Sequence, residues 1–134
     1  MYSSLKNVDD SGLSDEILCF DWEGNKVKKY ILPFLKDALE YCDEEIVLFA
    51  SPWSPPLWFK NRRAYSSGTF HMTEKNLRAY ALYFKKYVEA YQREGVPLVH
   101  ICPQNDPCLN QIFPSCVWTG DELGEFIGGY LGEV

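Results

Sequence analysis

Two short, largely apolar runs that each stop at a proline limit what this 134-residue chain can fold into. Residues 46–50 read IVLFA and lead into Ser51-Pro52, and residues 98–102 read LVHIC and lead into Pro103. Each run is too short for a helix and rich in strand-forming residues. Runs that are apolar throughout are typical of strands buried on both faces of a parallel sheet, so we expect two such strands.

Helical periodicity surrounds both predicted strands. Apolar residues share one side of residues 27–42, where Pro33 indicates a kink or a start near residue 32. Thr73 can cap a second helix, whose apolar and tyrosine side chains recur at three- and four-residue steps until Gly95 ends it. Residues 119–131 begin with a capping-box pattern and form a third. We expect the tyrosines of the second helix, from Tyr80 to Tyr91, to pack against the sheet.

This order of elements predicts an α/β fold with a βα repeat and a parallel sheet. Two strands alone cannot cover their own faces and edges. A complete eight-stranded barrel needs about 250 residues, roughly twice the length present. We therefore expect a single domain that forms an arc of a larger α/β structure.

Charge and cysteine content exclude several partners. The formal net charge of −6, without a basic stripe, argues against nucleic acid, and no apolar run is long enough to span a membrane. The first 15 residues lack the charged start and apolar centre of a signal peptide.

Five irregularly spaced cysteines fit free thiols, with one bridge among the last three left open. The zinc set His100, Cys102, Cys108 and Cys116 lacks a close cysteine pair, so we expect no metal.

Polar and aromatic residues held by prolines follow both predicted strands. Trp53 could offer a flat apolar face to a sugar ring, Asn105 could bond to a ring hydroxyl, and Asp106 could protonate a leaving oxygen. In an α/β barrel such strand ends collect on one functional side. The alternatives are that Asp106 is only a turn residue before Pro107 and that Trp53 is an ordinary core aromatic.

Three motifs in this order resemble the central part of the catalytic barrel of glycoside hydrolase family 30. They are "LFASPWSPPLWFK", "YFKKYVEAYQREGVPLVHICPQNDP" and "PSCVWTGDELGEFIGGYLG", and the resemblance runs from about residue 19 onward. It implies a partial (β/α)₈ TIM barrel, roughly strands 3–4 with helices 2–4. Residues 1–24 would be an irregular segment after strand 2, and residues 25–134 the partial barrel domain.

The same resemblance implies a retaining β-glycosidase that works without metal or organic cofactor and takes a carbohydrate or glycolipid substrate. Asn105 falls on the family's Asn near the sugar 2-hydroxyl, Trp53 on a Trp that lines the site, and Asp106 on the acid/base Glu. The resemblance implies a secreted or lysosomal protein, although these residues contain no signal-peptide pattern. The oligomeric state is left open.

One departure from the family affects the chemistry. Asp106 is one methylene shorter than Glu, so its carboxyl reaches about 1.5 Å less far, whereas retaining hydrolysis needs two carboxyls about 5–5.5 Å apart. The nucleophile's strand would follow residue 134, and the family's second-strand segment would precede residue 1. We therefore expect a glucosylceramidase-like fragment that is inactive alone. The alternative is a non-catalytic carbohydrate-binding or interaction module, or a pseudoenzyme remnant.

Overall fold

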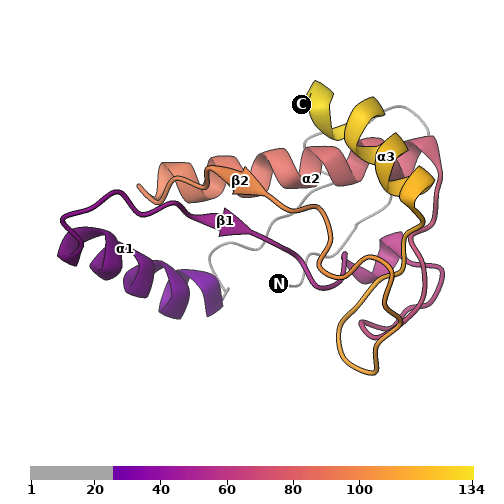
Figure 1. Cartoon of the computed structure of the whole chain (residues 1–134), viewed down its shortest axis with the longest axis horizontal. Coiled ribbons are helices and arrows are strands. Elements are labelled where there is room, and N and C mark those ends of the chain that lie inside the picture. Colours follow the sequence, from indigo (N-terminus) through magenta and orange to yellow (C-terminus); the bar gives the residue numbers. More distant parts are fainter. Residues whose placement is uncertain (1–25) are drawn as a thin grey trace.

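The computed structural model describes residues 26–134, whose course is drawn in Figure 1. Their order of helices and strands is the one that the periodicities predict. The proposed segment 1–24 lies outside the described residues, and its boundary stays a prediction. In chain order the elements are a π-helical turn (Val27–Ile31), α1 (Leu32–Tyr41), β1 (Phe49–Ala50), a 3-10 helix (Leu57–Phe59), α2 (Glu74–Arg93), β2 (His100–Ile101), α3 (Gly120–Gly129) and a second 3-10 helix (Leu131–Glu133).

β1 and β2 pair in parallel, as predicted. Phe49 lies opposite His100, and Ala50 lies opposite Ile101. Each strand is two residues long, shorter than the runs predicted for it. Within residues 26–134 the sheet contains these two strands only, so each has one neighbour with which to form ladder hydrogen bonds.

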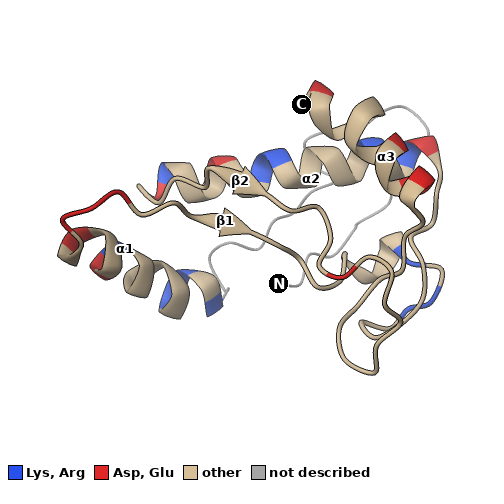
Figure 2. Ribbon diagram, viewed as in Figure 1, with Lys and Arg blue, Asp and Glu red and all other residues tan. Residues whose placement is uncertain are grey.

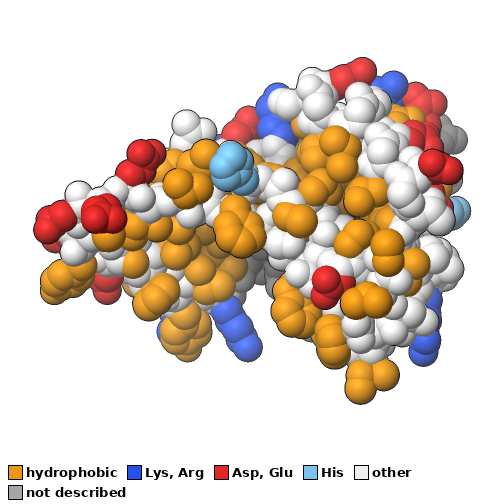
Figure 3. Space-filling view, viewed as in Figure 1, with side chains coloured by type: hydrophobic (Ala, Val, Ile, Leu, Met, Phe, Trp, Pro, Cys, Tyr) orange, Lys and Arg blue, Asp and Glu red, His pale blue; other side chains and the backbone are white. Residues whose placement is uncertain are grey.

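The prediction that both strand faces are buried is wrong for the described chain. Phe49 is 68% exposed, and Val47 and Val99 are also exposed. Ala50 and Ile101 are half-buried, and Ile101 packs against the main core. Because paired residues of a ladder share a face, one face meets the helices while the Phe49 face is open. Figure 3 shows hydrophobic side chains gathered over β1 and β2 on this view, the pattern expected of an arc from a larger sheet.

Helix α2 begins and ends as the sequence predicts. Thr73 Oγ1 accepts a hydrogen bond from the Asn76 N–H at 3.3 Å, which satisfies one free donor of the first turn. Beyond the last turn, Gly95 has a φ of +78° and its N–H donates to the Gln92 carbonyl at 3.0 Å. Glycine adopts this left-handed conformation without the steric cost that a Cβ brings.

Aromatic rings from α2, α3 and the long loop after β1 form the main core. Tyr80 is fully buried, with its ring centroid 5.2 Å from that of Phe59 and 5.3 Å from that of Phe126. Trp118 stacks on Phe70 at 4.5 Å. Contacts of this kind stabilise by about 0.5–1.5 kcal/mol each beyond their buried area. Tyr80, at the start of the tyrosine stripe, therefore packs in a core, but against aromatic rings of the loop and of α3 and not against the sheet that the sequence predicts as its partner.

The other two helices also start where the sequence indicates. A π-helical turn precedes Leu32, and Pro33 then occupies the first turn of α1, where its missing N–H costs little. At α3, Thr119 and Glu122 form the predicted capping box, with the Thr119 N–H donating to the Glu122 carboxylate at 2.7 Å. None of the helices in the described part of the chain is long and apolar enough to cross a membrane.

One cluster of acidic side chains lies away from the carboxyl ends of the strands. Residues 43–45 (Asp-Glu-Glu) form the connection between α1 and β1, drawn in red in Figure 2. This connection enters β1, so it lies at the opposite end of the strand from Trp53 and its loop. The end where the predicted site residues lie is therefore free of this charge cluster.

Candidate functional site

The backbones that leave β1 and β2 remain joined beyond the ladder. The Cys102 N–H donates to the Ala50 carbonyl at 2.9 Å, and the Asn105 N–H donates to the Pro52 carbonyl, also at 2.9 Å. The second bond lies beyond the last paired residues of both strands. The two loops that carry the predicted site residues therefore start from a common, hydrogen-bonded base.

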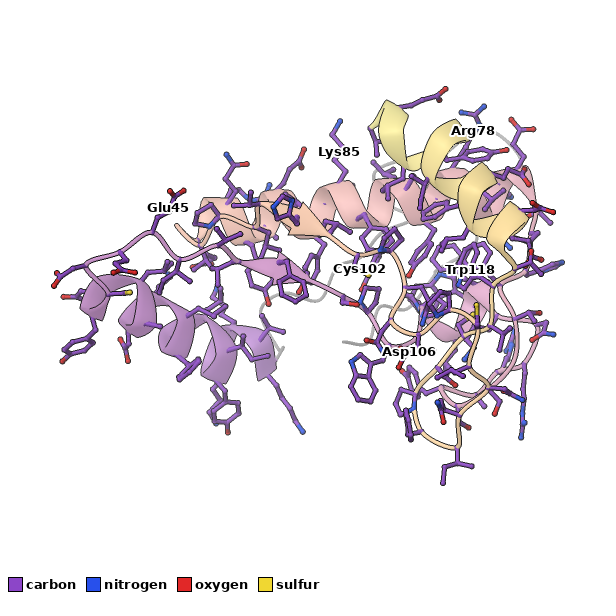
Figure 4. The ribbon with its side chains drawn as sticks, in the orientation of Figure 1. Glu45, Arg78, Lys85, Cys102, Asp106 and Trp118 are labelled. Atoms are coloured by element: carbon purple, nitrogen blue, oxygen red, sulfur yellow. The ribbon has the colours of Figure 1, made fainter. Side chains whose placement is uncertain are left out.

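Asp106 occupies a strained position in the loop after β2. Its φ is +44°, which is uncommon for any residue with a Cβ. Its carbonyl accepts from the Leu109 N–H at 3.0 Å, so Asp106 does open a turn, as one alternative held. Its Oδ2 accepts from Asn105 Nδ2 at 3.0 Å, which orients an exposed carboxylate. Figure 4 shows Asp106 on the loop beyond Cys102, with Trp118 on the side toward α3.

Trp53 is a surface residue, so the alternative that it is a core aromatic is wrong. Its side chain is 52% exposed, and its ring lies 5.5 Å from that of Phe113 at an angle of 55°. Phe113, which sequence reasoning did not identify, is 44% exposed and belongs to the loop after β2. One ring from each strand-exit loop therefore contributes to an exposed aromatic pair.

The Gln104 side chain joins the two loops through hydrogen bonds to their backbones. Its side chain is buried at 3% exposure, and its Nε2 donates to the carbonyls of Trp53 and Asn105, both at 2.9 Å. Sequence reasoning missed this residue. The available signal was an amide just beyond a predicted strand, where loop carbonyls without ladder partners need a donor.

Lys60 fastens the far ends of the same loops. Its Nζ donates to Ser54 Oγ at 3.1 Å, to the Tyr65 carbonyl at 2.8 Å and to the Ser115 carbonyl at 2.6 Å. Burial lowers the pKa of Lys60, while the nearby Cys116 thiol acts in the opposite direction. Burial likewise raises the pKa of the Cys116 thiol to about 11, which leaves it protonated and unreactive at neutral pH. Lys60 therefore joins the loops, whereas Cys116 supplies no thiolate at neutral pH.

A hollow lies between the exit of β1 and α2, but it is not shared by the predicted site residues. Burial of the Tyr83 and Tyr87 phenols raises the pKa of both, so this wall is uncharged at neutral pH. Neither Trp53 nor Asp106 lines the hollow, and a hollow common to those two residues stays a prediction. The lining residues are Ala50, Ser51, Pro52, Ser54, Tyr83, Phe84 and Tyr87.

The described residues offer no metal centre and no disulfide. Within residues 26–134, no group of three or more His, Cys, Asp or Glu side chains is placed to hold a metal ion. Cys42, Cys102, Cys108 and Cys116 are free thiols, so the bridge left open among the last three does not form. The chemistry available at the strand ends is that of an oriented carboxylate, an amide and an aromatic pair.

Parallel strands that alternate with helices, with polar residues at the strands' carboxyl ends, fit part of an α/β barrel. The family model of the glycosyl hydrolase family 30 TIM-barrel domain matches residues 2–133. The chain belongs to this family, as the motifs predict. The described part is a partial family barrel with two parallel strands and three helices.

Similar proteins include enzymes with two different names. Lysosomal acid glucosylceramidase of Mus musculus is 33% identical over 123 residues, which cover 82% of this chain and 22% of that protein. Endo-1,6-β-D-glucanase of Neurospora crassa is 34% identical over 90 residues, covering 65% of this chain and 19% of that protein. The chain thus spans about a fifth of the length of these curated relatives.

Solved structures agree with the fold. An endo-β1,6-glucanase superposes with a TM-score of 0.72 at 30% identity, covering 80% of this chain and 25% of that one. A glycoside hydrolase family 30 subfamily 8 xylanase from Clostridium acetobutylicum superposes with a TM-score of 0.69 at 24% identity, covering 85% of this chain and 30% of that one. The second likeness concerns the fold alone.

Proposed function

We propose that this chain forms the strand 3–4 part of a retaining β-glycosidase that hydrolyses the O-glycosidic bond of a β-glucoside or glycosphingolipid. The observation that supports this most is the hydrogen bond from the Asn105 N–H to the Pro52 carbonyl, which places the two strand-exit loops side by side. Relatives named glucosylceramidase and endo-1,6-β-D-glucanase support a β-glucosyl substrate.

In this proposal Trp53 and Asn105 bind the sugar. The exposed indole of Trp53 packs against the C–H face of a pyranose ring, and Phe113 limits the tilt of that indole. Asn105 Nδ2 already donates to the Asp106 carboxylate. The second N–H of this side-chain amide can donate to a sugar hydroxyl, and the side-chain oxygen Oδ1 can accept from one. Binding needs no charged group, in keeping with a neutral substrate.

Asp106 acts as general acid and then as general base. In the first step a second carboxylate attacks the anomeric carbon, the bond to the leaving oxygen breaks, and the Asp106 carboxyl gives its proton to that oxygen. In the second step the Asp106 carboxylate takes a proton from water, the water oxygen bonds to the anomeric carbon, and the attacking carboxylate is released. The second carboxylate must lie about 5–5.5 Å from Asp106 and, by family resemblance, comes from a later strand.

The isolated chain is therefore expected to bind a β-glucoside without hydrolysing it. The test is a titration of the full chain with gentiobiose and with octyl β-glucoside, followed by tryptophan fluorescence, beside a fluorogenic β-glucoside assay. Saturable binding that is lost in Trp53→Ala supports the proposal. Absence of binding contradicts it, and turnover by the wild type that Asp106→Ala abolishes contradicts the expected inactivity.

A non-catalytic carbohydrate-binding module is the second candidate. The exposed Trp53–Phe113 pair favours it, because sugar binding by such a pair needs no carboxylate. Asp106→Asn separates the two candidates when a longer family chain that includes these residues is assayed. An enzyme loses hydrolysis in that variant, whereas a binding module shows no hydrolysis even before the substitution.

A further inference from the structure

The side chain of Gln104 donates two hydrogen bonds to the backbone of the candidate site. Its Nε2 lies 2.9 Å from the Trp53 carbonyl and 2.9 Å from the Asn105 carbonyl. Carbonyl oxygens only accept, so the amide nitrogen must face both of them and the orientation of the amide is fixed. A single buried side chain thereby joins the backbones of the two loops.

The oxygen of the same amide makes no such contact with the described residues. Gln104 Oε1 is buried and has no hydrogen-bond partner within the described part of the chain. A buried acceptor without a partner costs free energy that an apolar side chain of similar size would avoid. What the amide supplies at this position is therefore the pair of hydrogen bonds that its nitrogen donates.

The residues above Gln104 need such support. Trp53 and Asp106 are both exposed, so burial of their own side chains does not fix them. Asp106 also holds a φ of +44°, which relaxes unless the neighbouring backbone is restrained. The Asn105 N–H to Pro52 bond restrains one side of this junction, and the Gln104 amide restrains the other.

We propose that Gln104 is a positioning residue that fixes the Trp53 backbone relative to that of Asn105 and Asp106. What these residues do for a sugar rests on the proposed function above, but the positioning itself does not. Through this amide, hydrogen bonds from a buried side chain set the spacing between the exposed Trp53 and the Asp106 carboxylate.

The test compares Gln104→Glu with Gln104→Met in the full chain, using the indole N–H signals in proton–nitrogen NMR spectra between about pH 4 and pH 8. Trp53→Phe assigns the Trp53 signal among the four tryptophans. Gln92→Glu, on the exposed surface of α2, is the matched control for the added charge.

In Gln104→Glu a protonated carboxyl still donates one bond, whereas the ionised form faces two carbonyl oxygens and donates none. The Trp53 signal should therefore lie closest to its wild-type position at low pH, where one of the two hydrogen bonds is kept, and move away as pH rises, with a midpoint above about 4.3, the ordinary Glu value. In Gln104→Met the signal should be displaced at every pH. In Gln92→Glu it should stay at the wild-type position throughout.

A Trp53 signal that remains at its wild-type position in both Gln104 variants overturns the proposal. So does a displacement shared equally by Trp118, because the residue would then support the whole core and not this junction. If Gln104→Glu unfolds above its midpoint, the Met variant decides by the same two criteria. No sugar is present, so a failure of the wild type to bind gentiobiose would remove the proposed function and leave this result standing.

Discussion

The backbone N–H of Asn105 donates to the carbonyl of Pro52 across 2.9 Å, joining two loops that are far apart in the sequence. This bond continues the parallel pairing of β1 and β2 past the end of the ladder. It brings an exposed indole and an exposed carboxylate to the same end of the sheet, where barrel enzymes place their reacting groups.

Trp53→Ala should weaken gentiobiose binding about tenfold, equivalent to roughly 1.4 kcal/mol, because the sugar loses its stacking surface. The free energy of unfolding should change by no more than about 1 kcal/mol, since the side chain is half exposed. Fluorescence and calorimetric titrations measure the first quantity, and urea unfolding the second. Trp53→Phe should keep most of the affinity; equal affinities for all three chains would contradict a stacking role.

Asp106→Ala should be less stable than Asp106→Gly by about 1 kcal/mol. The reason is the φ of +44°, a conformation in which any Cβ is crowded and glycine is not. Urea unfolding of the two variants side by side gives the difference. Equal stabilities would mean that the backbone of Asp106 relaxes when its carboxylate is removed, and that the strained conformation is not imposed by the loop.

Lys60→Met should lower the free energy of unfolding by about 2 kcal/mol. The substitution removes the donor of three hydrogen bonds and leaves the buried Ser115 carbonyl without this partner. Lys85→Met, on the exposed surface of α2, is the matched control and should stay within about 0.5 kcal/mol of wild type. If both variants unfold at the same urea concentration, Lys60 is not holding the loops.

Tyr80→Phe should change how stability depends on alkaline pH. Burial raises the pKa of the Tyr80 phenol well above 10, so above pH 10 the unfolded chain loses this proton while the folded chain keeps it. Wild-type stability then falls by up to about 1.4 kcal/mol per pH unit from this group alone. Tyr80→Phe should lack that loss of stability, whereas Tyr41→Phe, at an exposed position, should show the same loss as wild type. Urea unfolding at pH 8 and pH 11 measures it, and parallel losses in all three chains would contradict it.

Gly95→Ala and Gly124→Ala should act in opposite directions. Gly95 has a φ of +78°, so alanine there should cost about 1 kcal/mol. Gly124 lies within α3 with nothing within 4 Å of an added Cβ, so alanine there should add up to about 1 kcal/mol through helix propensity. Thermal unfolding of the pair compares them directly; the same sign for both would show that one of these backbone assignments is wrong.

Local signals were enough to predict much of the fold. Helix caps at Thr73 and Thr119 and the stop at Gly95 depend on neighbouring residues, and all three are present in the structure. The length and burial of the strands were predicted less well, because both depend on how many neighbouring strands pair with them. An apolar run such as residues 46–50 reads as fully buried, yet Phe49 is exposed where the described chain provides no cover.

Sequence reasoning could name candidate residues at the strand exits, but not the side chains that support their loops. Trp53, Asn105 and Asp106 follow predicted strand ends, where residue type alone suggests chemistry. Gln104 and Lys60 act through carbonyls 51 and 55 residues away along the chain, Trp53 and Ser115 respectively. Every residue type presents the same carbonyl, so no sequence pattern marks such a partner.

The most direct test is an NMR titration of the full, nitrogen-labelled chain with gentiobiose. If the loops after β1 and β2 form one sugar-binding edge, the Trp53 indole signal and the Asn105 and Asp106 backbone amides will move together and fit a single Kd. Movement of Trp53 without Asn105 and Asp106, or separate Kd values for the two loops, would show that the strand ends do not act as one site.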